Sequence, residues 1–174
     1  MKKILLSLFV FAITFSATAQ KKPQASPASK IVQTVGFTDV TVEFSRPSMK
    51  GRAIFGELIP FGKVWRTGAN QNTKITFSKD VKVGGKDLKA GTYALYTIPN
   101  KTSWDVIFYA DATNWGTPKK WDETKVAAKV STQVQTMPMK IESFTITFDD
   151  LKDTGAALGL LWEDTYVGVP FTVN

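Results

Sequence analysis

Apolar and polar residues alternate along much of the chain after residue 30. Between residues 40 and 45, the apolar side chains of Val40, Val42 and Phe44 are separated by polar ones. This period of two is typical of a β-strand with one buried face. Residues 31–35 are the predicted partner strand, and the segment 36–39 supplies the turn of a hairpin.

The same kind of pattern predicts further strands at 75–77, 81–83, 92–98, 104–109, 126–135, 141–148, 156–162 and 165–173. Turn-forming residues separate them, and no long amphipathic helix interrupts them. Pro170 predicts an edge position for the last strand, and Glu163-Asp164 is predicted to be a hairpin tip. About nine or ten strands of this kind predict an all-β, single-domain antiparallel β-sandwich over 30–174, immunoglobulin-like or transthyretin-like in architecture.

The N-terminal residues do not fit this pattern. Lys2 and Lys3 precede an apolar run that ends at Ala17-Thr18-Ala19, which is typical of a signal peptide over 1–19. No second apolar span follows, so we expect an exported protein in the periplasm or outside the cell, with no membrane span after cleavage. The absence of cysteine argues against a lipoprotein. The Pro/Ser-rich residues 20–29 predict a flexible lead.

The composition excludes several kinds of chemistry. The chain contains no histidine and no cysteine, which rules out Ser-His-Asp triads, Cys-His pairs and His-ligated zinc. No cofactor or metal is predicted, because the acidic residues at 149–153 fit a solvated turn better than a calcium site. The net charge is +7, but the lysines are scattered, so nucleic acid is not an expected partner.

All three arginines lie between residues 46 and 66, inside a segment, 46–73, that has no sustained period. Arginine offers a planar fork of donors that lysine lacks, which suits carboxylates, phosphates and groups of carbonyls. We therefore expect this segment to bind a small anionic or carbohydrate-like ligand, or an envelope partner. The candidate binding residues are Arg46, Arg52, Trp65, Arg66 and Asn70.

Two alternatives remain open at this point. The arginines would brace the loop if their donors bonded its unpaired backbone carbonyls. Alternatively, the protein would be an envelope hydrolase that uses carboxylate or tyrosine chemistry in place of histidine. The sequence favours a binding module over an enzyme, and it does not predict the ligand or the oligomeric state.

The motifs of the arginine segment are SRP at 45–47, KGR at 50–52 and PFGKVWRTGAN at 60–70, followed by AGTY at 90–93. With these motifs the chain closely resembles domain-of-unknown-function family 2911, a family of secreted bacterial proteins. The resemblance implies an exported all-β domain without an established activity. It also suggests an acidic residue where this chain has Gln71, and it is weaker around residues 115–125, so no role is transferred to that loop.

Overall fold

The computed structural model describes residues 22–173, and the predicted signal peptide and its cleavage site lie outside this range. The strands are β1 (Ala28–Val35), β2 (Thr38–Ser45), β3 (Thr73–Phe77), β4 (Val81–Val83), β5 (Lys86–Leu88), β6 (Gly91–Ile98), β7 (Ser103–Tyr109), β8 (Val126–Lys152) and β9 (Gly155–Val173). One turn of 3₁₀-helix, η1 (Glu123–Lys125), precedes β8. The described chain is therefore all-β, as the alternation predicts.

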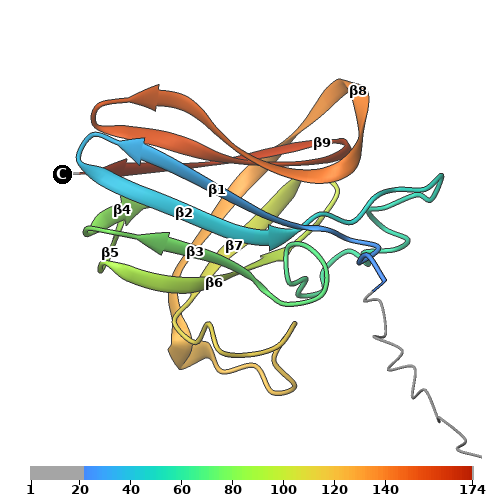
Figure 1. The fold of residues 1–174 in the computed structure, drawn as a ribbon, viewed down its shortest axis with the longest axis horizontal. Coiled ribbons are helices and arrows are strands. Elements are labelled where there is room, and N and C mark those ends of the chain that lie inside the picture. The colour runs from blue at the N-terminus through green and yellow to red at the C-terminus, as the bar shows by residue number, and fades with distance from the viewer. Residues whose placement is uncertain (1–21, 174) are drawn as a thin grey trace, which may run out of the picture.

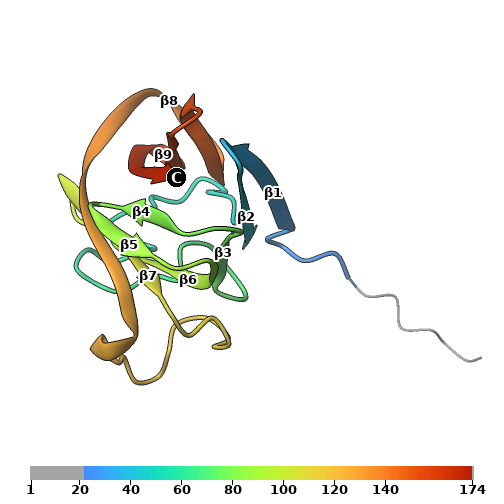
Figure 2. The same cartoon turned by 90° about the vertical axis from the view of Figure 1, so that its left-hand side faces the viewer.

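The strands form one antiparallel sheet in the order β1-β2-β3-β6-β7-β8-β9-β4-β5. Strand β8 belongs to both halves of this sheet, because its first residues pair with β7 and its later residues pair with β9. Figure 1 shows β8 and β9 above the strands β3 and β6, and Figure 2 shows β8 curving along one whole side of the molecule. The long curved strand thus folds the sheet over on itself, which gives a sandwich-like single domain.

The core lies between the two halves of the sheet. In β2, Val42 and Phe44 are buried and Glu43 between them is exposed, so the predicted alternation has its physical cause in one buried face. The centre of the core is aromatic, and it contains Phe55, Trp65, Trp104, Phe144 and Trp162, which contact one another edge-on or stacked. Because two of these residues come from the irregular segment, that segment is part of the core.

Two predicted strand boundaries are wrong, because four predicted strands form only two. Strand β8 continues through Pro138, where the pairing with β9 shifts between Thr136 and Ile141. Strand β9 continues through Glu163, which has φ 55 and faces Ile141 instead of forming a hairpin tip. Irregularities of this kind bend a strand without ending it. Because they contain the same residue types as turns, the sequence pattern predicts two strand ends. The short strand β5 was not predicted.

The predicted edge position of the last strand is also wrong, since β9 lies between β8 and β4. Its pairing with β8 ends at Val167, and its pairing with β4 begins at Phe171. Pro170 is exposed between these two ladders, so its missing N–H costs no ladder bond.

Several residues of the predicted lead, 20–29, make contacts with the fold. Strand β1 begins at Ala28, which pairs with Ser45, and Pro27 O accepts a hydrogen bond from Arg46 N at 2.9 Å. The Asn70 side chain also donates to Ser26 O at 3.1 Å and to Gln24 Oε1 at 3.3 Å. These contacts with a distant segment hold the lead, whose own composition favours flexibility.

Candidate functional site

The irregular segment occupies residues 46–72, between β2 and β3, and it begins as a short extension of β2 along β8. Ser48 forms a bridge with Ser143, and Phe144 N donates to Pro47 O at 2.9 Å. In an antiparallel pair the return bond would come from the N–H of residue 47, which proline lacks. Arg46 Nε donates to Phe144 O instead, at 3.0 Å, and Arg46 Nη2 donates to Thr145 Oγ1 at 2.7 Å. Arg46 therefore replaces a missing backbone donor.

Two other predicted site residues also make contacts within the fold. Arg52 is exposed, and it donates to the carbonyls of Met49 and Ser48 within its own turn, at 2.9 and 2.7 Å. Trp65 is only 6% exposed, stacks on Trp162 and donates from Nε1 to Gly68 O at 3.0 Å. The face of Trp65 packs in the core, so the exposed aromatic surface near this segment comes from another residue.

That residue is Trp115, which is 70% exposed and lines a groove of about 570 Å³. The groove runs along the start of β1, the end of β2 and the last residues of the irregular segment. Its lining is formed by Gln24, Ala28, Ser29, Lys30, Glu43, Phe44, Ser45, Asn70, Gln71, Asn72, Lys74 and Trp115. Of the five predicted binding residues, only Asn70 lines it, so the structure does not bring these five together in one cleft.

The backbone beside the groove is held in unusual conformations. Thr67 has φ 52 although it is β-branched, and Asn70 has φ 59. Conformations of this type cost about 1–3 kcal/mol each and persist only where surrounding contacts impose them. Here Thr73 Oγ1 donates to Thr67 O at 2.5 Å, and Thr67 itself is fully buried. Such local strain is frequently found at functional sites, which makes the segment around residues 66–72 the best candidate.

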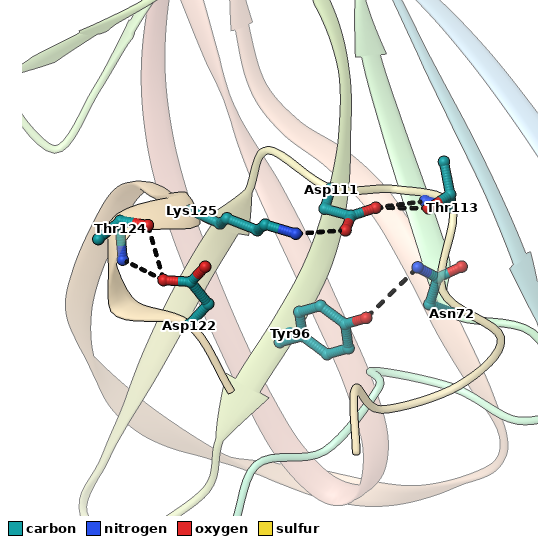
Figure 3. A network of polar contacts seen from close by, with 7 residues as sticks. All are labelled: Asn72, Tyr96, Asp111, Thr113, Asp122, Thr124 and Lys125. Carbon is teal, nitrogen blue, oxygen red and sulfur yellow. Dashed lines mark hydrogen bonds and ion pairs between the residues drawn. The ribbon is translucent and has the colours of Figure 1, made fainter. Parts of the chain in front are cut away.

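Sequence reasoning missed Asn72, which is only 3% exposed and lines the same groove. Its Nδ2 donates to Tyr96 Oη at 3.4 Å, and Tyr96 Oη donates to Gly116 O at 2.9 Å. Asn72 Oδ1 is buried without a hydrogen-bond partner, and so is Arg66 Nε. Figure 3 shows the Asn72 oxygen turned away from Tyr96. The only signal in the sequence was the run of amides at 70–72.

A second cleft, of about 510 Å³, lies under the loop that leads from β7 to β8. Its aromatic wall is Trp121, which packs on Tyr109 and Tyr96 and so joins a small satellite core. Its three acidic residues accept hydrogen bonds from their neighbours. Lys125 donates to Asp111 Oδ2 at 2.8 Å, and this bond holds the pKa of Asp111 well below its ordinary value. Hydrogen bonds from Thr124 likewise lower the pKa of Asp122, which caps η1 (Figure 3).

Between residues 22 and 173, no group of three or more acidic side chains is arranged to hold a metal ion. Over the same residues, no helix has the length and apolar character needed to cross a bilayer.

The chain was compared with known proteins. The model of the family described as "Protein of unknown function (DUF2911)" matches residues 26–171. Searches of curated proteins and of solved structures found no match. The family match includes both the irregular segment and the strands that hold it, and it confirms the resemblance found in the sequence motifs. The chain therefore belongs to the DUF2911 family of proteins of unknown function.

Proposed function

We propose that this protein is an exported, non-enzymatic domain that binds a neutral carbohydrate-like ligand in the groove beside Trp115. The observation that carries the proposal is an exposed indole next to a run of three amide side chains, Asn70, Gln71 and Asn72, in one open groove. Binding sites commonly combine aromatic surface with a few fixed polar groups. A sugar ring presents both an apolar face and hydroxyl groups, so it matches this combination.

The charges of the groove favour a neutral ligand over an anionic one. Lys30 is paired with Glu43, with 3.4 Å between Nζ and Oε1, and this leaves Lys74 as the other charged residue of the lining. The guanidinium groups of Arg46 and Arg52 bond to protein oxygens outside the groove. The forked donors of these two arginines, which would recognise a carboxylate or phosphate, are therefore occupied elsewhere.

The same lining favours binding over hydrolysis. Glycoside hydrolysis generally uses two carboxyl groups about 5–9.5 Å apart on either side of the scissile bond. Glu43 is the single carboxylate in the lining of this groove, and it is in an ion pair. In the second cleft, the lowered pKa values of Asp111 and Asp122 make both residues poor proton donors at neutral pH.

The test is calorimetric titration of residues 20–174 with neutral tetrasaccharides, cellotetraose and tetra-N-acetylchitotetraose, and with tetragalacturonate as the anionic comparison. We expect saturable binding of a neutral tetrasaccharide, and at least a tenfold loss of affinity in Trp115→Ala. Phe37→Ala is the matched control, because Phe37 is 82% exposed at the β1–β2 turn, outside the groove. Equal binding by both variants, or binding of tetragalacturonate alone, would contradict the proposal.

A further inference from the structure

Two polar groups of opposite type are buried without a partner near the end of the irregular segment, between residues 66 and 72. Asn72 Oδ1 is a hydrogen-bond acceptor and Arg66 Nε–H is a donor, and neither bonds to any protein atom. An unsatisfied buried group of this kind costs about 1–3 kcal/mol, so it requires an explanation. Both groups belong to the segment in which Thr67 and Asn70 have strained backbones.

Both side chains meet the same residue of the Trp115 loop. A Cβ on Gly116 would lie 3.8 Å from Arg66 Cδ, so the stem of Arg66 packs against this glycine. Asn72 reaches Gly116 through the hydroxyl of Tyr96, which donates to Gly116 O. Gly116 therefore contacts the stem of Arg66 directly and Asn72 through Tyr96, and its neighbour Trp115 lines the groove.

We propose that Asn72 Oδ1 and Arg66 Nε bind one hydroxyl group of the ligand when the loop at 113–120 moves aside. This inference rests on the proposed function and names two of its specificity-determining residues. A hydroxyl group donates one hydrogen bond and accepts others, so it satisfies both orphan groups at once. A carboxylate or phosphate would leave Asn72 Oδ1 unpaired, and an ammonium group would leave Arg66 Nε unpaired.

The contacts of the loop at 113–120 are compatible with this movement. Its two ends are fixed, by the ion pair of Asp111 with Lys125 at 2.8 Å and by the packing of Trp121 on Tyr109. Between these ends, the hydrogen bond from Tyr96 to Gly116 ties the loop to β6. In the proposed movement this bond breaks, while the contacts at the two ends keep the loop attached.

The experiment titrates cellotetraose and tetra-N-acetylchitotetraose into three variants whose thermal unfolding is measured in parallel. Arg66→Met keeps the stem against Gly116 and removes the donor, and Asn72→Ala removes the acceptor. Asn72→Asp keeps an acceptor oxygen at nearly the same place. We expect at least a tenfold loss of affinity in the first two variants and recovery to within a few-fold in Asn72→Asp. Asn100→Ala, an exposed amide outside the groove, is the control for a general effect of removing an amide.

Both tetrasaccharides offer hydroxyl groups, and the acetylated one also offers acetamido groups, which likewise donate and accept hydrogen bonds. Comparison of the two affinities therefore distinguishes a hydroxyl group from an acetamido group as the partner of Asn72 and Arg66. Tyr96→Phe provides a second measurement, since we expect faster hydrogen exchange at residues 113–120 without loss of binding. If wild type binds neither tetrasaccharide, the proposed function fails and this inference fails with it. If Trp115→Ala loses binding but Arg66→Met and Asn72→Ala bind like wild type, only this inference fails. A crystal structure of the complex in which Asn72 Oδ1 is bonded to an enclosed water, and not to the ligand, would also overturn it.

Discussion

Replacing Arg46 by methionine separates the bracing role of the arginines from any role in binding. Methionine keeps most of the apolar stem and removes both donated hydrogen bonds. Thr145 Oγ1 stays bonded, because it also donates to Ser143 O at 2.8 Å. Phe144 O loses the donor that Pro47 cannot replace, so the junction between the irregular segment and β8 is left with an unpaired carbonyl.

The size of the effect follows from these contacts. A hydrogen bond from a charged donor is worth about 1.5–3 kcal/mol net, and the bond to Phe144 O is partly buried. We expect Arg46→Met to lower the free energy of unfolding by about 2–3 kcal/mol, which corresponds to a fall in Tm of roughly 4–12 °C for a domain of this size. Arg46→Lys should lie between wild type and Arg46→Met, because an ammonium group cannot reproduce the fork.

The assay is urea unfolding followed by tryptophan fluorescence, with Arg52→Met as the matched control. Arg52 is exposed and bonds only carbonyls three and four residues away, and Met49 O keeps a second donor, Arg52 N, at 3.1 Å. Its loss should therefore cost less than about 1 kcal/mol. Equal losses in the two variants, or a loss below about 0.5 kcal/mol for Arg46→Met, would refute the reasoning.

Three further predictions concern packing and pH. Gly159→Ala should cost about 1–3 kcal/mol in urea unfolding, since a Cβ there would overlap the side chains of Thr147 and Asp149, and an unchanged midpoint would contradict this. Because the pKa of Asp111 is lower in the folded protein than its ordinary 3.8, its contribution is complete above that value and is lost as pH falls below it. Wild type should therefore lose its advantage over Asp111→Asn on acidification, and a constant difference between them would argue against the Lys125 contact. Burial and a hydrogen bond to Asp149 raise the pKa of Tyr166 from 10.0 to about 12, so stability should fall as pH rises through this window, and the fall should be smaller in Tyr166→Phe.

The sequence by itself determined the class of fold and the position of its irregular part. Alternation in β1 and β2 predicted a half-buried hairpin correctly, because period two in apolar residues reports one buried face directly. The break in this pattern placed the irregular segment at 46–73, and the structure has it at 46–72. The family motifs pointed to the same segment, and the family match supports that membership.

Only the tertiary structure decided what the residues of that segment do. The partner of Arg46 is a carbonyl 98 residues away. Trp115 and Trp121 lie in the same loop, but Trp115 is exposed and Trp121 packs against a small cluster of buried residues. Asn72 became a candidate because a distant tyrosine satisfies its amide nitrogen and nothing satisfies its oxygen. Local sequence encodes backbone preference and the burial of one face, whereas hydrogen-bond partners and exposure depend on which distant strands the long, bent β8 brings together.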